Sequence, residues 1–284
     1  MKSCSLLITL LLTLSACQPA PQNAVGTDDS AAVIGGQPIQ KRNTLAARSV
    51  VLLELLDADG FSPTFCTATL VGPNTILTAA HCFDKKLIKS FVSFRVVFAN
   101  SISDSLIGSK PAEIRAGVFY KNHPEYNSTG EYDHDIAVGI FKGSIPSGFA
   151  IMAMDTDKIA NYGGKNLYVY GYGKSRNYTG KLNEDLRAHT GVLNRGVLKV
   201  TPSYTQHEDR YLIVPESQAH ICQGDSGGPQ FYQSGEVLKI VGVTSANMGP
   251  VLPNGRQSCT AWSQATKVAP FYTWIKSIEK KVLQ

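Results

Sequence analysis

Residues 224–229 combine the residue types needed for nucleophilic catalysis by a serine. The segment reads GDSGGP, so small residues surround Ser226 and Asp225 directly precedes it. A serine hydroxyl is a poor nucleophile at neutral pH and needs a base to accept its proton. That base in turn needs a buried carboxylate, which fixes its tautomer and stabilises the imidazolium that forms. The segment therefore predicts a hydrolase whose His and Asp lie elsewhere in the chain.

Two upstream segments supply candidates for these partners. The apolar, β-prone run of residues 69–77 breaks into small residues in the sequence LTAAHC, and His81, which follows them, is the candidate base. Asp135 lies in DHDIAV directly before an apolar run, which would put its carboxylate at the edge of a buried strand. Asp133 is the alternative, because residues two apart lie on the same side of an extended segment. No catalytic role is assigned to four other histidines, His123, His134, His189 and His207.

The motifs TAAHC, DIAV and GDSGGP, in this order, resemble those of the chymotrypsin and trypsin family of serine proteases. The resemblance covers residues 33–284, and subtilisins and α/β-hydrolases place the same three residue types in other orders. It implies a catalytic triad of His81, Asp135 and Ser226, with the carboxylate directly before the Ile-Ala-Val run, and it leaves Asp133 facing solvent. It also implies an all-β fold of two six-stranded antiparallel β-barrels followed by a C-terminal α-helix.

Further roles near the nucleophile follow from the same resemblance. The backbone amides of Gly224 and Ser226 are expected to form the oxyanion hole, where Gly permits a backbone conformation that a side chain would resist. Ser245 matches the family residue that hydrogen-bonds the catalytic Asp. Val33 matches the first residue of the mature enzymes, whose freed ammonium pairs with the Asp before the nucleophile, here Asp225. The chain is therefore expected to be a zymogen that is activated by cleavage before Val33.

The specificity pocket departs from the family's best-known members. The residue at the pocket base, six positions before the nucleophile, is Asp in trypsins but His220 here, and the wall positions align to Asn247 and Ser263. We therefore expect a P1 preference that is not basic. An acidic or polar P1 side chain and a small one both remain open, and His220 could instead bond a structural water or a backbone carbonyl.

The first 32 residues indicate export. Residues 1–16 have a positive start and a short apolar run that ends in LSAC, which resembles a bacterial lipoprotein signal with Cys17 as the lipidated residue. An ordinary secretory signal is the alternative. Residues 17–32 are small and polar, as in a linker or propeptide. We expect the protein in the bacterial cell envelope, lipid-anchored or periplasmic, or secreted once cleavage after Ala32 has removed the tether.

Cysteine usage agrees with export. Of the six cysteines, Cys4 leaves with the signal and Cys17 would carry lipid, so four remain and allow three pairings. The resemblance selects Cys66 with Cys82 and Cys222 with Cys259. Both disulfides need an oxidising compartment.

The rest of the chain reads as short strands separated by turn residues. Runs rich in Val, Ile, Phe and Tyr include 50–56, 93–98, 168–172 and 238–243, whereas helical spacing is clear only in 270–281. We expect the first barrel over about residues 33–150, the second over about 151–268 and the helix over about 269–281.

Charge and composition limit the remaining functions. The net charge of +5 comes from scattered Lys and Arg, so no nucleic-acid surface is expected. No metal site or cofactor is expected, and a lipid on Cys17 is the only membrane contact foreseen. The expected partners are protein or peptide substrates of a monomeric enzyme. The competing hypothesis is a catalytically silent homologue that acts as a surface binding or adhesion module.

Overall fold

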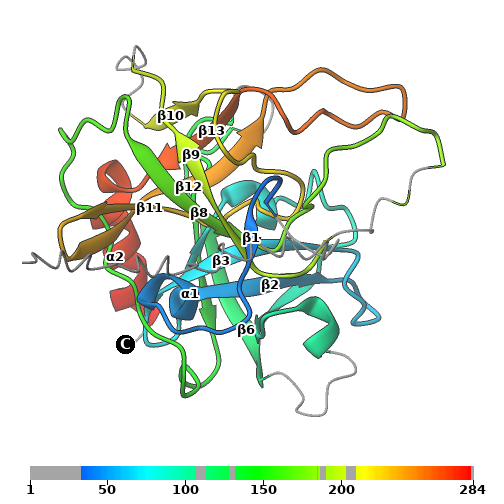
Figure 1. The fold of residues 1–284 in the computed structure, drawn as a ribbon. Coiled ribbons are helices and arrows are strands. Elements are labelled where there is room, and N and C mark those ends of the chain that lie inside the picture. The colour runs from blue at the N-terminus through cyan, green and yellow to red at the C-terminus, as the bar shows by residue number, and fades with distance from the viewer. Residues whose placement is uncertain are drawn as a thin grey trace, which may run out of the picture.

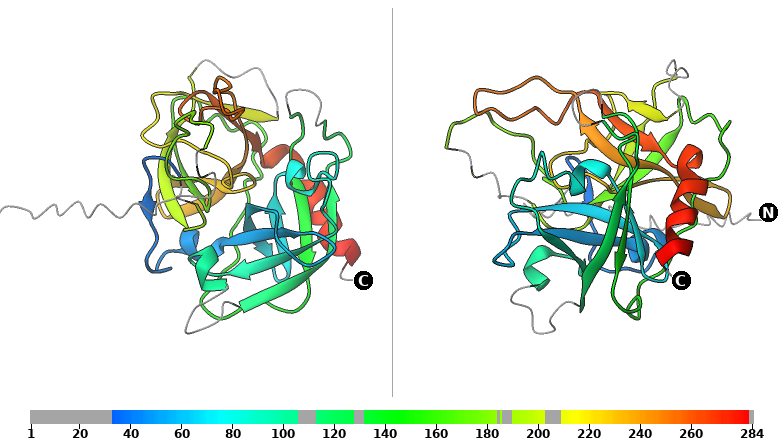
Figure 2. Two further views of the ribbon diagram at one scale, coloured as in Figure 1. Left: turned by 90° about the vertical axis from the view of Figure 1, so that its right-hand side faces the viewer. Right: turned by 180° about the vertical axis from the view of Figure 1, so that it is seen from behind.

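A computed structural model describes residues 33–105, 113–127, 132–183, 185, 190–202 and 209–282. The expected signal, the linker and Cys17 lie outside these residues, as do His189 and His207. The described chain forms two β-sheets that pack against each other, with one long helix at the C-terminal end (Figures 1 and 2).

The first sheet is a closed antiparallel barrel in the order β2-β3-β4-β7-β6-β5. Its strands are β2 (Val50–Leu56), β3 (Thr64–Gly72), β4 (Thr75–Thr78), β5 (Ser93–Phe98), β6 (Glu113–Asn122) and β7 (Ala137–Phe141). Closure leaves no free strand edge in this half of the molecule.

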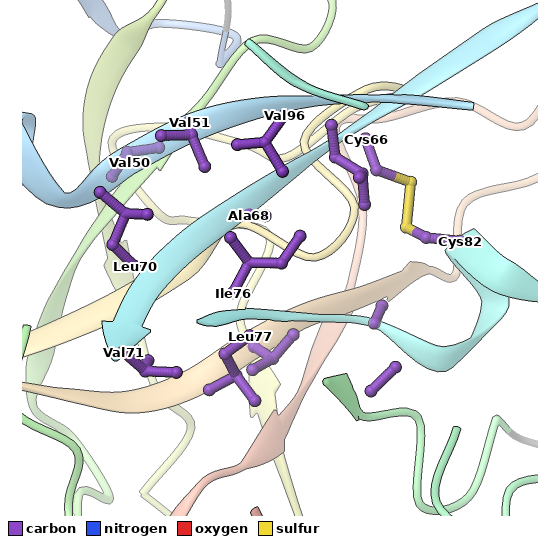
Figure 3. Close-up of a cluster of buried hydrophobic side chains, with 14 of the residues drawn as sticks. Val50, Val51, Cys66, Ala68, Leu70, Val71, Ile76, Leu77, Cys82 and Val96 are labelled. Carbon is purple, nitrogen blue, oxygen red and sulfur yellow. A yellow bond between two sulfur atoms is a disulfide. The ribbon is translucent and has the colours of Figure 1, made fainter. Parts of the chain in front are cut away.

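The barrel closes because its strands carry side chains that fill the interior. β2 is almost wholly apolar and buried, and Figure 3 shows its valines beside Val71 of β3, Ile76 and Leu77 of β4 and Val96 of β5, with the Cys66–Cys82 disulfide at one end of the cluster. Glu54 is the exception within β2, because it is buried in an apolar strand. It lies directly opposite Arg95 of β5 and forms an ion pair with it, so the buried charge is compensated.

The second sheet has seven strands in the order β1-β9-β8-β11-β12-β13-β10. They are β1 (Gln37–Pro38), β8 (Asn166–Gly171), β9 (Asn194–Lys199), β10 (Arg210–Ile213), β11 (Pro229–Ser234), β12 (Val237–Asn247) and β13 (Ser263–Lys267). An isolated bridge from Val200 to Ile213 joins the end of β9 to β10, so the sheet curls round on itself.

The all-β, trypsin-like fold expected from the sequence is confirmed, with one difference in detail. β1 belongs to the second sheet, where Gln37 pairs with Arg195, although the sequence assigned residues 33–150 to the first barrel. The cause lies just upstream, where Gly35 adopts a φ of +74°. A Cβ there would lie 2.7 Å from the carbonyl oxygen of Gln218, so only glycine lets this segment run against the second half.

The helices are few and mostly short. α1 (Leu45–Ser49) is capped by Thr44, whose Oγ1 accepts a hydrogen bond from the Ala47 amide at 3.2 Å. The 3₁₀ turns are η1 (Ala80–Phe83), η2 (Ile102–Ser105) and η3 (Ala269–Phe271). None of the helices among the described residues is long and apolar enough to cross a membrane.

The C-terminal helix α2 (Tyr272–Val282) follows the second sheet but packs on the first barrel. Its buried side chains Ile275 and Ile278 belong to the same hydrophobic cluster as the barrel interior, and Trp274 packs against that cluster. The helix therefore holds the second half of the chain against the first (Figure 2).

Candidate active site

The pairing of β4 with β7 brings two of the sequence-predicted site residues together. Thr78, near the end of β4, lies opposite Ala137 at the start of β7, so the segment that continues to His81 runs beside the one that contains Asp135. The His81 backbone amide donates to Asp135 Oδ1 at 2.9 Å, and the His81 ring joins Asp135 Oδ2 through Nδ1 at 2.8 Å. A carboxylate can only accept, so this contact requires the proton on Nδ1 and leaves Nε2 free to act as a base.

Asp135 also receives a hydrogen bond from the second half of the molecule. Ser245, in β12, donates its hydroxyl to Asp135 Oδ2 at 2.5 Å. The Asp135 side chain is fully buried, and burial alone would raise its pKa, but the charge of His81 and the hydrogen bonds from His81 and Ser245 hold the pKa below its usual value. The carboxylate therefore remains ionised although it has no contact with water.

The contact between Asp135 and His81 also controls the protonation of the His81 ring. Burial lowers the pKa of the imidazole, whereas the charge of Asp135 and its hydrogen bond raise it, with a smaller contribution from Asp84. The raising effects win, and the pKa of His81 lies above its usual value. The site thus stabilises an imidazolium, which is the state that a general base reaches after accepting a proton.

Asp133 is not positioned to replace Asp135. Its carboxylate forms an ion pair with Arg210 of β10, and 38% of the side chain is exposed to solvent, so it lies at the surface beside the other half of the molecule. His134 between them has a φ of +53°, and Tyr132 has a φ of +56°. These left-handed residues break the extended geometry that would have placed both carboxylates on one side.

The loop that contains Ser226 packs directly against the segment that leads to His81. Ser226 is half-buried, and its carbonyl accepts a hydrogen bond from the Thr67 amide at 2.8 Å. The amide of the next residue, Gly227, donates to the carbonyl of Thr244 at 2.8 Å, directly beside Ser245. A Cβ on Gly227 would lie 1.9 Å from Thr78 Oγ1, so only glycine allows this approach.

Gly224 has the backbone conformation that the sequence pattern implied. Its φ is +96°, and a Cβ would lie 2.6 Å from the Phe65 ring and 2.8 Å from the Cα of Gly173. Within the described part of the chain, the amides of Gly224 and Ser226 donate no hydrogen bond, so both are available to an incoming oxyanion.

Thr67 is a site residue that the sequence reading missed. Its hydroxyl donates to the carbonyl of Gly224 at 2.8 Å and accepts from the Tyr172 amide at 3.1 Å, while its own amide holds Ser226. Thr67 thus fixes the peptide group between Gly224 and Asp225 and the one between Ser226 and Gly227. The available signal was a buried polar residue directly after Cys66 in a strand that is otherwise largely apolar.

The carboxylate of Asp225 is buried with two backbone donors. Oδ1 accepts from the Gly173 amide at 2.8 Å and Oδ2 from the Cys222 amide at 2.9 Å, and no cation pairs with it among the described residues. Burial raises the pKa of Asp225 to about 7, although these two amides lower it. The side chain of Val33 is fully buried nearby, in a hydrophobic cluster with Ala219 and Ile221.

The expected pocket residues lie in two places. Asn247 and Ser263 are cross-strand partners in β12 and β13, and Asn247 Oδ1 accepts the Gly249 amide at 3.1 Å. His220 exchanges two backbone hydrogen bonds of 2.9 Å with Ile34, and burial lowers the pKa of its half-buried ring. No hydrogen bond joins His220 to Asn247 or Ser263 within the described residues.

Both disulfides that the resemblance selected are present in the structure, Cys66–Cys82 beside His81 and Cys222–Cys259 beside the Ser226 loop. Cys66, Cys82 and His81 are close enough together to hold a metal ion. The two sulfurs are bonded to each other, however, and a disulfide offers no thiolate for coordination.

The coupling between His81 and Asp135 gives a prediction about His81. In the Asp135→Asn variant, the His81 pKa should fall below its usual value, because desolvation remains while the attraction is lost. Titration of the His81 ring by NMR measures this. Asp84→Asn is the control and should lower the pKa only slightly, since Asp84 contributes least. A His81 pKa that stays raised in Asp135→Asn would contradict the assignment of the carboxylate.

Comparison with known proteins places this geometry in a family. A family model described as Trypsin matches residues 33–275. The chain is 26% identical to a trypsin of Saccharopolyspora erythraea over 193 residues, which is 66% of this chain and 78% of that protein. It is 26% identical to human transmembrane protease serine 5 over 256 residues, which is 86% of this chain but 50% of that protein.

A third relative is the phenoloxidase-activating enzyme 1 of Spodoptera litura, at 25% identity over 279 residues, covering 91% of this chain and 70% of that protein. These identities are low, but the family model spans both sheets and every residue of the site described above. The chain belongs to the trypsin family of serine proteases.

Proposed function

We propose that the protein is an exported serine endopeptidase that hydrolyses peptide bonds through an acyl-enzyme. The observation that carries this proposal is the buried Asp135 carboxylate, which holds His81 from one side and Ser245 from the other while the Ser226 loop packs against Thr78. This arrangement joins a base, an orienting carboxylate and a serine across the two halves of the chain.

Each residue has a defined role in the proposed reaction. Ser226 Oγ attacks the carbonyl carbon of the substrate while His81 Nε2 accepts the hydroxyl proton. Asp135 stays ionised and stabilises the resulting imidazolium. The oxygen of the tetrahedral intermediate then accepts from the Gly224 and Ser226 amides, and a donor of this kind contributes about 3 kcal/mol in comparable enzymes. The intermediate then collapses: the bond from the carbonyl carbon to nitrogen breaks, and His81 gives its proton to the leaving amine, which leaves the acyl-enzyme. Water next attacks the ester carbonyl while His81 accepts a proton from it, and collapse of the second intermediate returns that proton to Ser226 Oγ and releases the carboxylic acid product.

Active-site labelling tests the proposed reaction. A fluorophosphonate should label the protein that begins at Val33, and Ser226→Ala should abolish labelling and lower kcat by about 10⁶-fold, as loss of a triad nucleophile does. Ser234→Ala, at the exposed end of β11, is the control and should leave labelling unchanged. Correctly processed and folded protein that takes no label would favour the alternative, a catalytically silent binding module.

We further propose that the enzyme is made as a zymogen, tethered to the bacterial envelope through Cys17 and released by cleavage before Val33. Three features support this proposal. The family match begins at Val33, its side chain is buried beside Ile221, and the buried Asp225 lacks a cation among the described residues. A new ammonium at Val33 would supply that cation, which makes the ion pair a switch rather than a source of stability.

The activation proposal predicts how stability depends on pH. The folded-state pKa of Asp225 is about 7, above the unfolded value of 3.8, so its contribution to stability is full below pH 3.8 and is lost as pH rises to about 7. Uncleaved protein should therefore lose stability over this range, whereas a Val33 ammonium should reduce the loss in cleaved protein. Urea unfolding of both forms, each carrying Ser226→Ala, measures the difference. Equal pH dependence in the two forms would rule out the ion pair.

For substrates, we propose a P1 preference that is acidic, polar or small rather than basic. A neutral His220 offers no negative charge to a Lys or Arg side chain, and its lowered pKa keeps it neutral at pH 7. At lower pH the ring gains a proton and would favour an acidic P1 residue. Asn247 and Ser263 add polar groups and bulk at the proposed walls.

A P1 peptide library on the mature enzyme tests this preference. Cleavage after Arg or Lys should be at least about tenfold weaker than after the best residue, a difference of about 1.4 kcal/mol. If His220 binds the P1 side chain, the ratio of kcat/KM for acidic over small P1 residues should rise as pH falls, and His220→Gln should remove that rise. Strong cleavage after Arg or Lys would refute the proposed pocket.

A further inference from the structure

The chain between β12 and β13 forms an arm, residues 248–262, whose two stems continue the proposed pocket walls. The Met248 amide donates to the Trp262 carbonyl at 2.7 Å, one residue beyond the Asn247–Ser263 pair, and Val251 bridges to Gln257 further out. In Figure 1 the arm projects from the ends of β12 and β13, alongside the segment that follows β8. The two stems of the arm are therefore continuous with the strands that carry Asn247 and Ser263.

The arm is held by little apolar packing. Met248 is 53% exposed and Val251 69% exposed, and the hydrophobic cluster beneath the arm contains only Tyr178, Cys222 and Cys259 as buried members. Burial of so little apolar surface cannot fix a segment of this length. Its position must depend on the Cys222–Cys259 disulfide and on polar contacts with the neighbouring segment.

Asn177 makes three hydrogen bonds to the arm and one to its own neighbour Tyr178. Its Oδ1 accepts the Cys259 amide at 2.8 Å and the Tyr178 amide at 3.0 Å. Its Nδ2 donates to Ser258 Oγ at 3.0 Å and to Thr260 Oγ1 at 3.2 Å. One planar amide thus satisfies a donor or an acceptor on each of three consecutive arm residues.

The next residue, Tyr178, connects this contact to the catalytic loop. Its buried ring packs on the Cys222–Cys259 disulfide, and its hydroxyl hydrogen-bonds to the side chain of Gln223. Gln223 directly precedes Gly224, the proposed oxyanion donor. Asn177 therefore lies where the arm, the disulfide and the Ser226 loop meet.

We propose that Asn177 is a positioning residue for polypeptide substrates: it holds the 248–262 arm, and with it the pocket walls, in the geometry that binds a peptide. This inference rests on the proposed function. It assigns Asn177 no contact with the reacting atoms, so a small reagent that acylates Ser226 without filling the arm-side surface should not need it.

Kinetics of Asn177→Ala test the proposal. For a fluorogenic peptide with residues on both sides of the scissile bond, KM should rise about tenfold, which corresponds to about 1.4 kcal/mol, while kcat changes less than about twofold. The rate of fluorophosphonate labelling should also change less than about twofold, because the triad is untouched.

Asn177→Asp is the conservative variant. A carboxylate can accept from the Cys259 and Tyr178 amides and from the Ser258 and Thr260 hydroxyls, so it should restore KM to within about twofold of the parent. The matched control is Asn161→Ala. Among the described residues, the Asn161 side chain accepts only the local Gly163 amide, at 2.8 Å, so this variant should leave KM unchanged.

The outcomes separate this inference from the proposed function. A parent enzyme that neither takes label nor cleaves peptide overturns both. If the parent is active and Asn177→Ala has the same KM as the parent, only the role of Asn177 is overturned. The same holds if Asn177→Ala loses kcat and labelling rate to an equal extent, because that result would indicate a general structural role. If Asn177→Ala does not fold, the double variant Ser258→Ala/Thr260→Ala replaces it, because this variant removes only the two contacts of Asn177 Nδ2. It should raise KM about threefold, and an unchanged KM in the double variant also overturns the proposal.

Discussion

The buried carboxylate of Asp135 sets the main constraint on this molecule. An ionised group without water is costly unless charges and hydrogen bonds compensate it, and here the compensation comes from two different sheets. His81 contributes its ring and its amide from the first barrel, and Ser245 contributes its hydroxyl from the second sheet. A small displacement of one half relative to the other would remove the Ser245 hydroxyl from this buried charge and leave only the two His81 donors. The two halves must therefore keep a fixed relative position.

Several other contacts across the two halves serve that requirement. Gly227 approaches Thr78 at a distance that admits no side chain, and Arg210 of the second sheet forms an ion pair with Asp133 next to the catalytic segment. The chain itself crosses over twice, since β1 precedes the first barrel but joins the second sheet, while α2 follows the second sheet but packs on the first. The second sheet thus includes the segment that precedes the first barrel, and the first barrel packs against the segment that follows the second sheet.

The sequence predicted best the elements whose structure follows from their own local pattern of residues. The strands at 50–56 and 93–98 have the bounds expected from their apolar runs, because side-chain burial alone selects them. The sequence was least informative about residues whose role depends on hydrogen bonds to backbone groups far away in the chain. Thr67 and Asn177 hold peptide groups that are far away in sequence, and nothing in their neighbours reveals those partners. β1 has only two residues, too few for any periodicity to appear.

The position of β1 has a consequence for the protein just after the proposed cleavage before Val33. β1 occupies one end of the second sheet and pairs with β9, which would otherwise present an unpaired edge. Unpaired edges recruit strands from other molecules and promote aggregation. A new terminus formed by the proposed cleavage, if it left its buried position, would loosen β1 and expose the Asn194–Arg195 end of β9. If the chain is cleaved before Val33 as proposed, rapid docking of the segment that begins there would protect the protein against self-association as well as place the new ammonium.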